Sequence, residues 1–151
     1  MKIYYREKSG GIEILRCFGI EGRVEIPGMI DDKLVISAAP YAFSSHMDEK
    51  EDLKNASLWE VSDGLEFGRE ENVLAGNDVE EIVFPYTLKE IGRYIFYGCG
   101  NLKKLEFSDS LMQIGCGAFT GCHALEKLTV HMRQGKKSGV KEMLGEMWQR
   151  I

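Results

Sequence analysis

Apolar residues recur at fixed steps of 23 positions in the second half of the chain. Residues 82–99 and 105–122 can be laid over each other with that constant offset and no gap. The positions that carry the same residue in both segments are Phe84/Phe107, Leu88/Leu111, Ile91/Ile114, Gly92/Gly115, Phe96/Phe119, Gly98/Gly121 and Cys99/Cys122. A period of about 20–29 residues with leucine-type residues at set positions is typical of a leucine-rich solenoid, in which each coil buries its apolar face against the next. We therefore expect a repeat solenoid with short parallel strands and irregular or helical returns.

Within each unit, alternating apolar residues predict one short strand whose inward side chains form a ladder from coil to coil. The three strand segments are Val79-x-x-Ile82-x-Phe84, Leu102-x-x-Leu105-x-Phe107 and Leu125-x-x-Leu128-x-Val130. The chain then turns back through segments in which an aromatic residue fills the core and glycines permit the corners.

The first 43 residues predict a different beginning. Residues 2–6 and 12–18 read as a β-hairpin, because residues 8–11 contain two glycines that permit the positive φ of a tight turn. Residues 23–27 alternate and read as a further strand. Ala42 and Phe43 then match Ala118 and Phe119, which marks a first repeat unit.

The spacing between the first unit and the regular units predicts an extra, degenerate unit. Phe43 and Phe96 are 53 residues apart, which is two periods of 23 plus seven. Leu53, Ala56 and Leu58 have the spacing of a ladder strand and are its expected core. The remaining residues 59–73 would then form a charged excursion with a turn at residues 63–64.

The tail after Gly135 predicts an amphipathic α-helix. Its apolar residues share one helical stripe: Val140, Met143, Leu144, Met147, Trp148 and Ile151. A helix directly after the last coil is expected to cap the open end of the stack. The alternative, a helix that lies on a membrane surface, is disfavoured because Glu142 and Glu146 dilute its cationic face.

We expect the 151 residues to form a single leucine-rich-repeat domain. Its expected parts are an N-terminal β cap (1–27), first and degenerate units with an acidic insertion (28–78), regular 23-residue units (79–132) and a C-terminal amphipathic helix (133–151).

Charge and composition argue against several functions. Residues 48–81 carry a local charge of −9 within a chain of net charge −5, whereas nucleic-acid binding needs a continuous basic surface. The short basic cluster of Arg133, Lys136, Lys137 and Lys141 reads as a solvated linker, with an anion site as the alternative. No apolar run has the roughly 18 residues of a membrane span.

The segment 114–130, Ile-Gly-Cys-Gly-Ala-Phe-Thr-Gly-Cys-His-Ala-Leu-Glu-Lys-Leu-Thr-Val, resembles the BspA-type (Treponema-type) leucine-rich repeat family. Residues 24–43 are similar to the opening of such domains. The resemblance implies a bacterial solenoid, usually at the cell surface, that binds proteins or matrix components and has no catalytic centre. If Met1 is the native start, the charged N-terminus lacks a secretory signal and predicts a cytoplasmic protein, with the cell surface as the alternative.

The cysteines and histidines do not form a recognisable reactive site. Cys99 and Cys122 occupy equivalent repeat positions, so we expect them to be buried packing residues, with a disulfide or a metal site as the alternatives. Their neighbours Cys116, His123 and His131 lack the spacing of a zinc site. We expect no cofactor, no metal and no enzymatic activity, because phosphate-loop, dinucleotide and nucleophile-elbow motifs are also missing.

The remaining candidate site is the exposed face of the predicted strands. Outward positions there should form three columns: Glu81/Lys104/Lys127, Val83/Glu106/Thr129 and Pro85/Ser108/His131. Strands about 4.8 Å apart would make Glu81 and Lys104 a cross-strand ion pair. The predicted binding residues are Glu81, Val83, Lys104, Glu106, Lys127, Thr129 and His131; the alternative is that these positions are only solvated.

The sequence thus predicts a non-catalytic module that binds a protein or surface ligand. The alternative is a structural protein that associates weakly with itself through the open sheet edge or the C-terminal helix.

Overall fold

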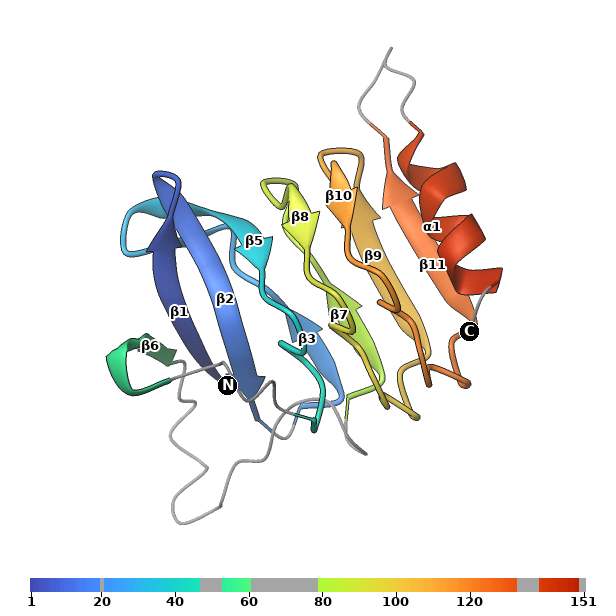
Figure 1. Ribbon diagram of the computed structural model, residues 1–151, viewed down its shortest axis with the longest axis horizontal. Coiled ribbons are helices and arrows are strands. Elements are labelled where there is room, and N and C mark those ends of the chain that lie inside the picture. Colours follow the sequence, from blue (N-terminus) through green and yellow to red (C-terminus); the bar gives the residue numbers. More distant parts are fainter. Residues whose placement is uncertain (20, 47–52, 61–78, 133–138, 150–151) are drawn as a thin grey trace.

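The computed structural model describes residues 1–19, 21–46, 53–60, 79–132 and 139–149, and in these residues the chain forms two β-sheets that face each other (Figure 1). The first sheet has the strand order β10-β8-β5-β2-β1-β6, with β4 beside β5, and the second has the order β11-β9-β7-β3. In the first sheet the strands are β1 (Lys2–Lys8), β2 (Gly11–Phe18), β4 (Met29–Ile30), β5 (Lys33–Ala38), β6 (Ser57–Glu60), β8 (Glu90–Ile91) and β10 (Gln113–Ile114). In the second they are β3 (Arg23–Glu25), β7 (Glu81–Val83), β9 (Lys104–Ser108) and β11 (Lys127–His131).

The regular coils stack in the register that the 23-residue period predicts. Ile82 of β7 lies opposite Leu105 of β9, and Leu105 lies opposite Leu128 of β11, all in parallel strands. On the other sheet Ile91 of β8 lies opposite Ile114 of β10. The predicted repeat solenoid is therefore confirmed.

Phenylalanine rings run through the core from coil to coil. The rings of Phe96 and Phe119 are stacked with their centroids 5.9 Å apart, and those of Phe84 and Phe107 are stacked at 4.9 Å. Phe43 continues the first stack, 5.8 Å from Phe96. The repeated aromatic residue thus fills the space between the two sheets in each coil.

The predicted degenerate unit between Phe43 and Phe96 is wrong. Phe43 packs directly on Phe96, and β3 pairs directly with β7, so the first coil is the immediate neighbour of the second. The spacing of 53 residues is one period of 23 plus an excursion of 30. The predicted ladder strand falls instead on the 3-10 turn Leu53–Asn55 and on β6, which pairs antiparallel with β1. A segment with alternating apolar residues can pair with any strand edge that is open. Here the segment of β6 pairs with the open edge of β1 in the hairpin. The predicted turn at residues 63–64 lies outside the described residues.

The N-terminal hairpin is confirmed. Strands β1 and β2 pair antiparallel, and Ser9 (φ 52°) and Gly10 (φ 78°) form the turn in the left-handed region. Because β2 then pairs parallel with β5, the hairpin extends the first sheet beyond the first coil and covers that end of the core.

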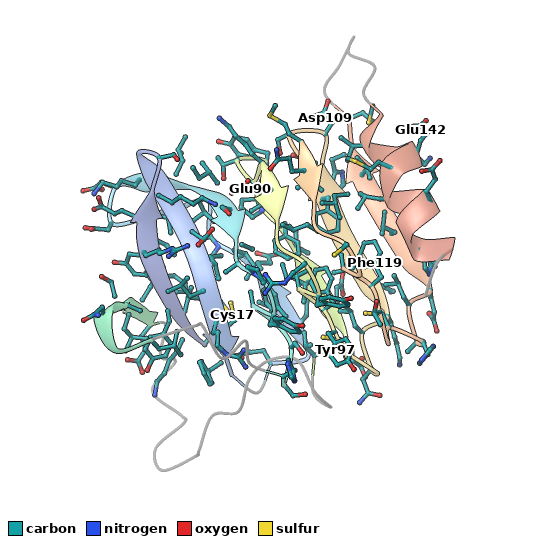
Figure 2. All side chains as sticks on the ribbon, in the orientation of Figure 1. Cys17, Glu90, Tyr97, Asp109, Phe119 and Glu142 are labelled. Carbon is teal, nitrogen blue, oxygen red and sulfur yellow. The ribbon has the colours of Figure 1, made fainter. Side chains whose placement is uncertain are left out.

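The C-terminal cap is also confirmed. Helix α1 (Val140–Gln149) lies beside β11 at the end of the stack (Figure 1). Val140 and Leu144 are buried in the same core as the phenylalanines, and Trp148 packs against it half-buried. Glu142 lies on the exposed side of the helix (Figure 2).

Candidate binding surfaces

The outer face of the second sheet, here called the strand face, holds all the predicted binding residues. Adjacent strands place Glu81, Lys104 and Lys127 in one row, and Val83, Glu106 and Thr129 in the next. Lys104, Lys127 and His131 are exposed, whereas Glu81, Val83, Glu106 and Thr129 are half-buried.

Strand β3 adds two residues that the sequence analysis missed. Arg23 stands beside Glu81, and Glu25 beside Val83. The 23-residue period could not reveal them, because the 30-residue excursion separates β3 from β7. The strand face is therefore one strand wider than predicted.

On the strand face, the row of charges is paired on β3 and β7, whereas on β9 and β11, at the opposite side of the sheet, the described residues of that row form no ion pair. Arg23 contacts Glu25 at 2.6 Å and Glu81 at 3.6 Å, so Glu81 turns to β3 rather than forming the predicted ion pair with Lys104. Nε2 of His131 lies 3.3 Å from a carboxylate oxygen of Glu106. Lys104 and Lys127 are neighbours on adjacent strands, and within the described part of the chain neither has an ion-pair partner.

A hollow of about 260 Å³ lies at the carboxyl end of the strand face. Exposed Tyr86 and Met132 flank it together with His131, and Ser108, Asp109 and Ser110 form its floor. The expectation that Ser108 projects into solvent is wrong, because this residue is buried and its hydroxyl oxygen lies 2.5 Å from that of Ser110. The third predicted column is thus a lined hollow rather than an exposed row.

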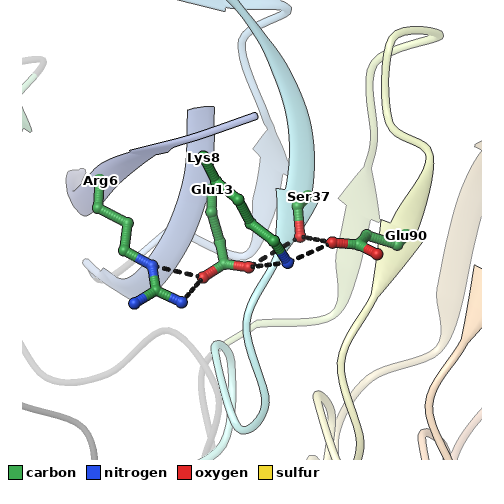
Figure 3. Close-up of polar contacts among 5 residues, drawn as sticks. All are labelled: Arg6, Lys8, Glu13, Ser37 and Glu90. Atoms are coloured by element: carbon green, nitrogen blue, oxygen red, sulfur yellow. Dashed lines mark hydrogen bonds and ion pairs between the residues drawn. The ribbon is translucent and has the colours of Figure 1, made fainter. Parts of the chain in front are cut away.

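The outer face of the first sheet carries a network of charged and polar side chains that the sequence analysis did not predict (Figure 3). The buried carboxylate of Glu13 accepts hydrogen bonds from Arg6 (2.8 Å), Lys8 (3.0 Å) and the Ser37 hydroxyl (3.0 Å). Glu90 accepts from the same Lys8 (2.5 Å), and the single proton of the Ser37 hydroxyl, 2.8 Å from Glu90, is shared between Glu90 and Glu13. Hydrogen bonds from Lys8 and then from Ser37 lower the pKa of Glu90, and Glu90 and then Glu13 raise the pKa of Lys8.

This network forms the polar end of a larger hollow of about 460 Å³. Its other end is apolar and is lined by Met112, Ile114 and Met143 of α1. The charges at the polar end neutralise one another, so the hollow offers an incoming group little net charge. Lys8 and Glu90 are 82 residues apart in sequence, which is why their contact could not be predicted.

The buried thiols belong to the core. Cys99 and Cys122 are free and buried, and each donates a weak hydrogen bond to the carbonyl of the phenylalanine one coil earlier, Phe43 (3.4 Å) or Phe96 (3.2 Å). Burial raises the pKa of both thiols, that of Cys122 to about 12. Such thiols remain protonated and are poor nucleophiles or ligands. Across the described residues, no group of three or more His, Cys, Asp or Glu side chains is placed to hold a metal ion.

The comparisons with known proteins agree with this architecture. A family model described as BspA type Leucine rich repeat region matches residues 70–139. The crystal structure of a leucine rich cell surface protein from Faecalibacterium prausnitzii is similar to this chain with a TM-score of 0.57 and 19% identity, over 85% of this chain and 30% of that one. The chain therefore spans 30% of the length of that protein.

Two further crystal structures match with lower TM-scores. The pneumococcal vaccine antigen PcpA is 21% identical over 90% of this chain and 38% of that one, with a TM-score of 0.45. A leucine rich repeat protein of T. pallidum is 15% identical over 96% and 92% of the two chains, with a TM-score of 0.39. No curated protein matches the chain. Within the described ranges, no helix has both the length and the apolar character needed to cross a bilayer.

Proposed function

This chain carries BspA-type leucine-rich repeats, and from that premise we propose that it is a non-catalytic protein-interaction module whose partner docks on the strand face. The proposed contact residues are the predicted set (Glu81, Val83, Lys104, Glu106, Lys127, Thr129 and His131) together with Arg23, Glu25, Tyr86 and Met132.

The hollow at the carboxyl end of the strand face is the observation that carries the proposal. Tyr86 is 79% exposed and Met132 is 44% exposed, on either side of a concave site. Tyrosine and methionine are enriched in the buried centres of protein interfaces, where aromatic anchors supply much of the binding energy. A partner side chain that enters the hollow would cover both.

The charges of the strand face support an acidic partner. Lys104 and Lys127 lie side by side, and Glu81, the other neighbour of Lys104, forms its ion pair with Arg23. Two neighbouring like charges repel each other, and an acidic group between them relieves that repulsion. Complementary charge of this kind speeds association and orients the partner.

We further propose that the module works at the cell surface. The support is the structurally similar F. prausnitzii protein, which is a leucine rich cell surface protein.

Site-directed photo-crosslinking tests the docking surface in cells that produce the full chain. A photoreactive residue at position 86 or 129 should capture a protein, and one at position 113, exposed on the opposite sheet, should not. The double variant Lys104→Glu, Lys127→Glu should lower the yield of adduct, because it removes the attraction for an acidic partner. Lys89→Glu is the matched control, an exposed lysine away from the strand face. Equal capture at all three positions, or equal loss in both charge variants, would contradict the proposal.

A further inference from the structure

Aromatic side chains gather where the first and second coils turn, far from the strand-face hollow. This aromatic cluster consists of Tyr41, His46, Tyr94 and Tyr97. The rings of Tyr41 and Tyr94 are stacked at 5.6 Å, while Tyr97 stands nearly perpendicular to both, at 72° and 84°. His46 lies against Tyr41 at 4.8 Å. Figure 2 shows Tyr97 at the end of the molecule opposite Asp109, which lines the hollow.

Two of these tyrosines have an unfavourable backbone conformation. Tyr41 (φ 59°) and Tyr94 (φ 52°) are left-handed, a region that side chains with a β-carbon disfavour. The equivalent position of the third coil, 23 residues after Tyr94, is Gly117 (φ 65°), the residue best suited to it. Non-glycine residues held in such conformations cluster at functional sites.

The third coil shows that the fold itself does not require the aromatic rings. Its residues at the positions of Tyr94 and Tyr97 are Gly117 and Thr120, and the coil keeps the same core. A β-carbon on Gly117 would lie 2.3 Å from the Tyr94 ring, so the glycine lets that ring lie flat against the third coil. The aromatic cluster is thus confined to two coils and closed at one end by the third.

A buried arginine holds the loop that carries the aromatic cluster. The Arg16 guanidinium donates hydrogen bonds to the carbonyls of Tyr41 (3.2 Å), Ser44 (2.8 Å) and His46 (3.2 Å). The Ser44 hydroxyl in turn donates to the carbonyl of Tyr97 (2.6 Å), which ties the first coil to the second. Binding sites require their contact residues to be fixed in this way.

The chemistry of the aromatic cluster favours a ligand that has apolar faces and carries no positive charge. Tyr97 is 41% exposed and contacts the rings of Tyr41 and Tyr94 edge to face. The guanidinium of Arg93 lies 5.9 Å from the Tyr41 ring, so a cationic ligand would meet like charge. A pyranose ring presents C–H groups on its faces, which pack on aromatic rings, and hydroxyls at its edge, which bond with phenol and imidazole groups.

We propose that the aromatic cluster binds a hexopyranose unit of a neutral polysaccharide, with Tyr97 as the stacking platform. This site is separate from the strand face, so the two proposals stand or fall independently.

Native affinity electrophoresis of the full chain tests the proposal. Gels that contain laminarin, mannan, xyloglucan or galactomannan should include at least one that retards the wild-type protein. Tyr97→Ala should weaken that retardation about tenfold, because the stacking platform is lost, whereas Tyr97→Phe should keep it.

Two control variants and one competing outcome complete the test. Thr120→Ala, at the equivalent position of the third coil, and Tyr86→Ala, at the strand-face hollow, should bind like wild type. The proposal is overturned if no polysaccharide retards the protein, if Tyr97→Ala binds normally, or if Thr120→Ala loses as much. Capture of a protein by a photoreactive residue at position 97 would also overturn it, since the aromatic cluster would then be a peptide-docking surface.

Discussion

The regular coils and the N-terminal part of this chain are held together in different ways. Between residues 79 and 132 the contacts between coils are apolar ladders and stacked phenylalanines. In the N-terminal part, Glu13 and Arg16 are buried at 3% exposure, each within a network of hydrogen bonds. Where the sequence period holds, the repeated apolar residues set the register between coils. Where the period is broken by the hairpin and the excursion, the same apolar core continues through residues such as Ile14 and Phe43, and buried charged networks add to it.

Deleting the C-terminal helix that caps the regular coils should have the largest effect on stability and oligomeric state. A chain that ends at residue 135 loses α1 and with it the burial of Val140 and Leu144, each worth about 1.5–3 kcal/mol. The freed edge of β11 should then pair with other molecules. Light scattering coupled to gel filtration should detect oligomers. If the truncated chain stays monomeric with an unchanged melting temperature, α1 is no cap.

Removing a ring from the phenylalanine stack should have the second largest effect on stability. Phe96 contacts Phe43, Phe84 and Phe119, so Phe96→Ala leaves a cavity at the centre of the core and should cost about 3–5 kcal/mol of unfolding free energy. Tyr86→Ala removes an aromatic ring that is 79% exposed and should change stability by less than about 0.5 kcal/mol. Urea unfolding measures both. Similar losses for the two variants would mean that the phenylalanines do not hold the coils together.

Removing the buried arginine of the N-terminal part should lower the free energy of unfolding by less than removing a core phenylalanine. Arg16→Met keeps the volume but removes the guanidinium that donates to the carbonyls of Tyr41, Ser44 and His46, of which, among the described residues, only that of Tyr41 keeps a backbone donor, and should cost about 1–3 kcal/mol. Lys103→Met, an exposed lysine in a 3.7 Å ion pair with Glu80, is the matched control and should cost less than about 0.5 kcal/mol. If the two substitutions were equal in urea unfolding, the buried arginine would not organise this end of the chain.

The smallest expected effect is the pH-dependent contribution of Glu90 to stability. Since Lys8 and Ser37 lower the pKa of Glu90, its ionised form stabilises the fold above its ordinary pKa of about 4.3, and this contribution is lost as the pH falls through the lower folded value. Glu90→Gln should therefore cost about 0.5–1 kcal/mol at pH 7 and less than that at pH 3. Glu126→Gln, on an exposed residue of the regular coils, is the control and should change the stability at pH 7 by less than about 0.5 kcal/mol. A constant difference between wild type and Glu90→Gln at all pH values would contradict this reading of the network.

The sequence predicted the regular half because residues one period apart occupy equivalent positions in neighbouring coils and therefore lie opposite each other. Once Leu105 and Leu128 were seen to be 23 residues apart, their contact followed, and so did the rows of the strand face. The β3 row could not be predicted, because an excursion of unknown length stands between Glu25 and Val83. The networks around Glu13 and Arg16 depend on contacts between distant segments, for which a single sequence carries no signal.

The central claim is that the first coil lies directly on the second, so that the strand face runs unbroken from β3 to β11. A disulfide between neighbouring strands tests this most directly. In a Cys116→Ser background, which removes the exposed native thiol, the pair Glu25→Cys and Val83→Cys should oxidise within one chain. Neighbouring strands are about 4.8 Å apart, within the Cα separation of about 4.4–6.8 Å that a disulfide spans.

The control pair, Glu25→Cys and Glu106→Cys, lies two strands apart and should remain reduced. Mass spectrometry of the non-reduced protein reads both results. A disulfide in the first pair alone is the predicted outcome. If the first pair stays reduced in the folded protein while Val83→Cys and Glu106→Cys oxidise readily, then another coil separates β3 from β7 and the account is wrong.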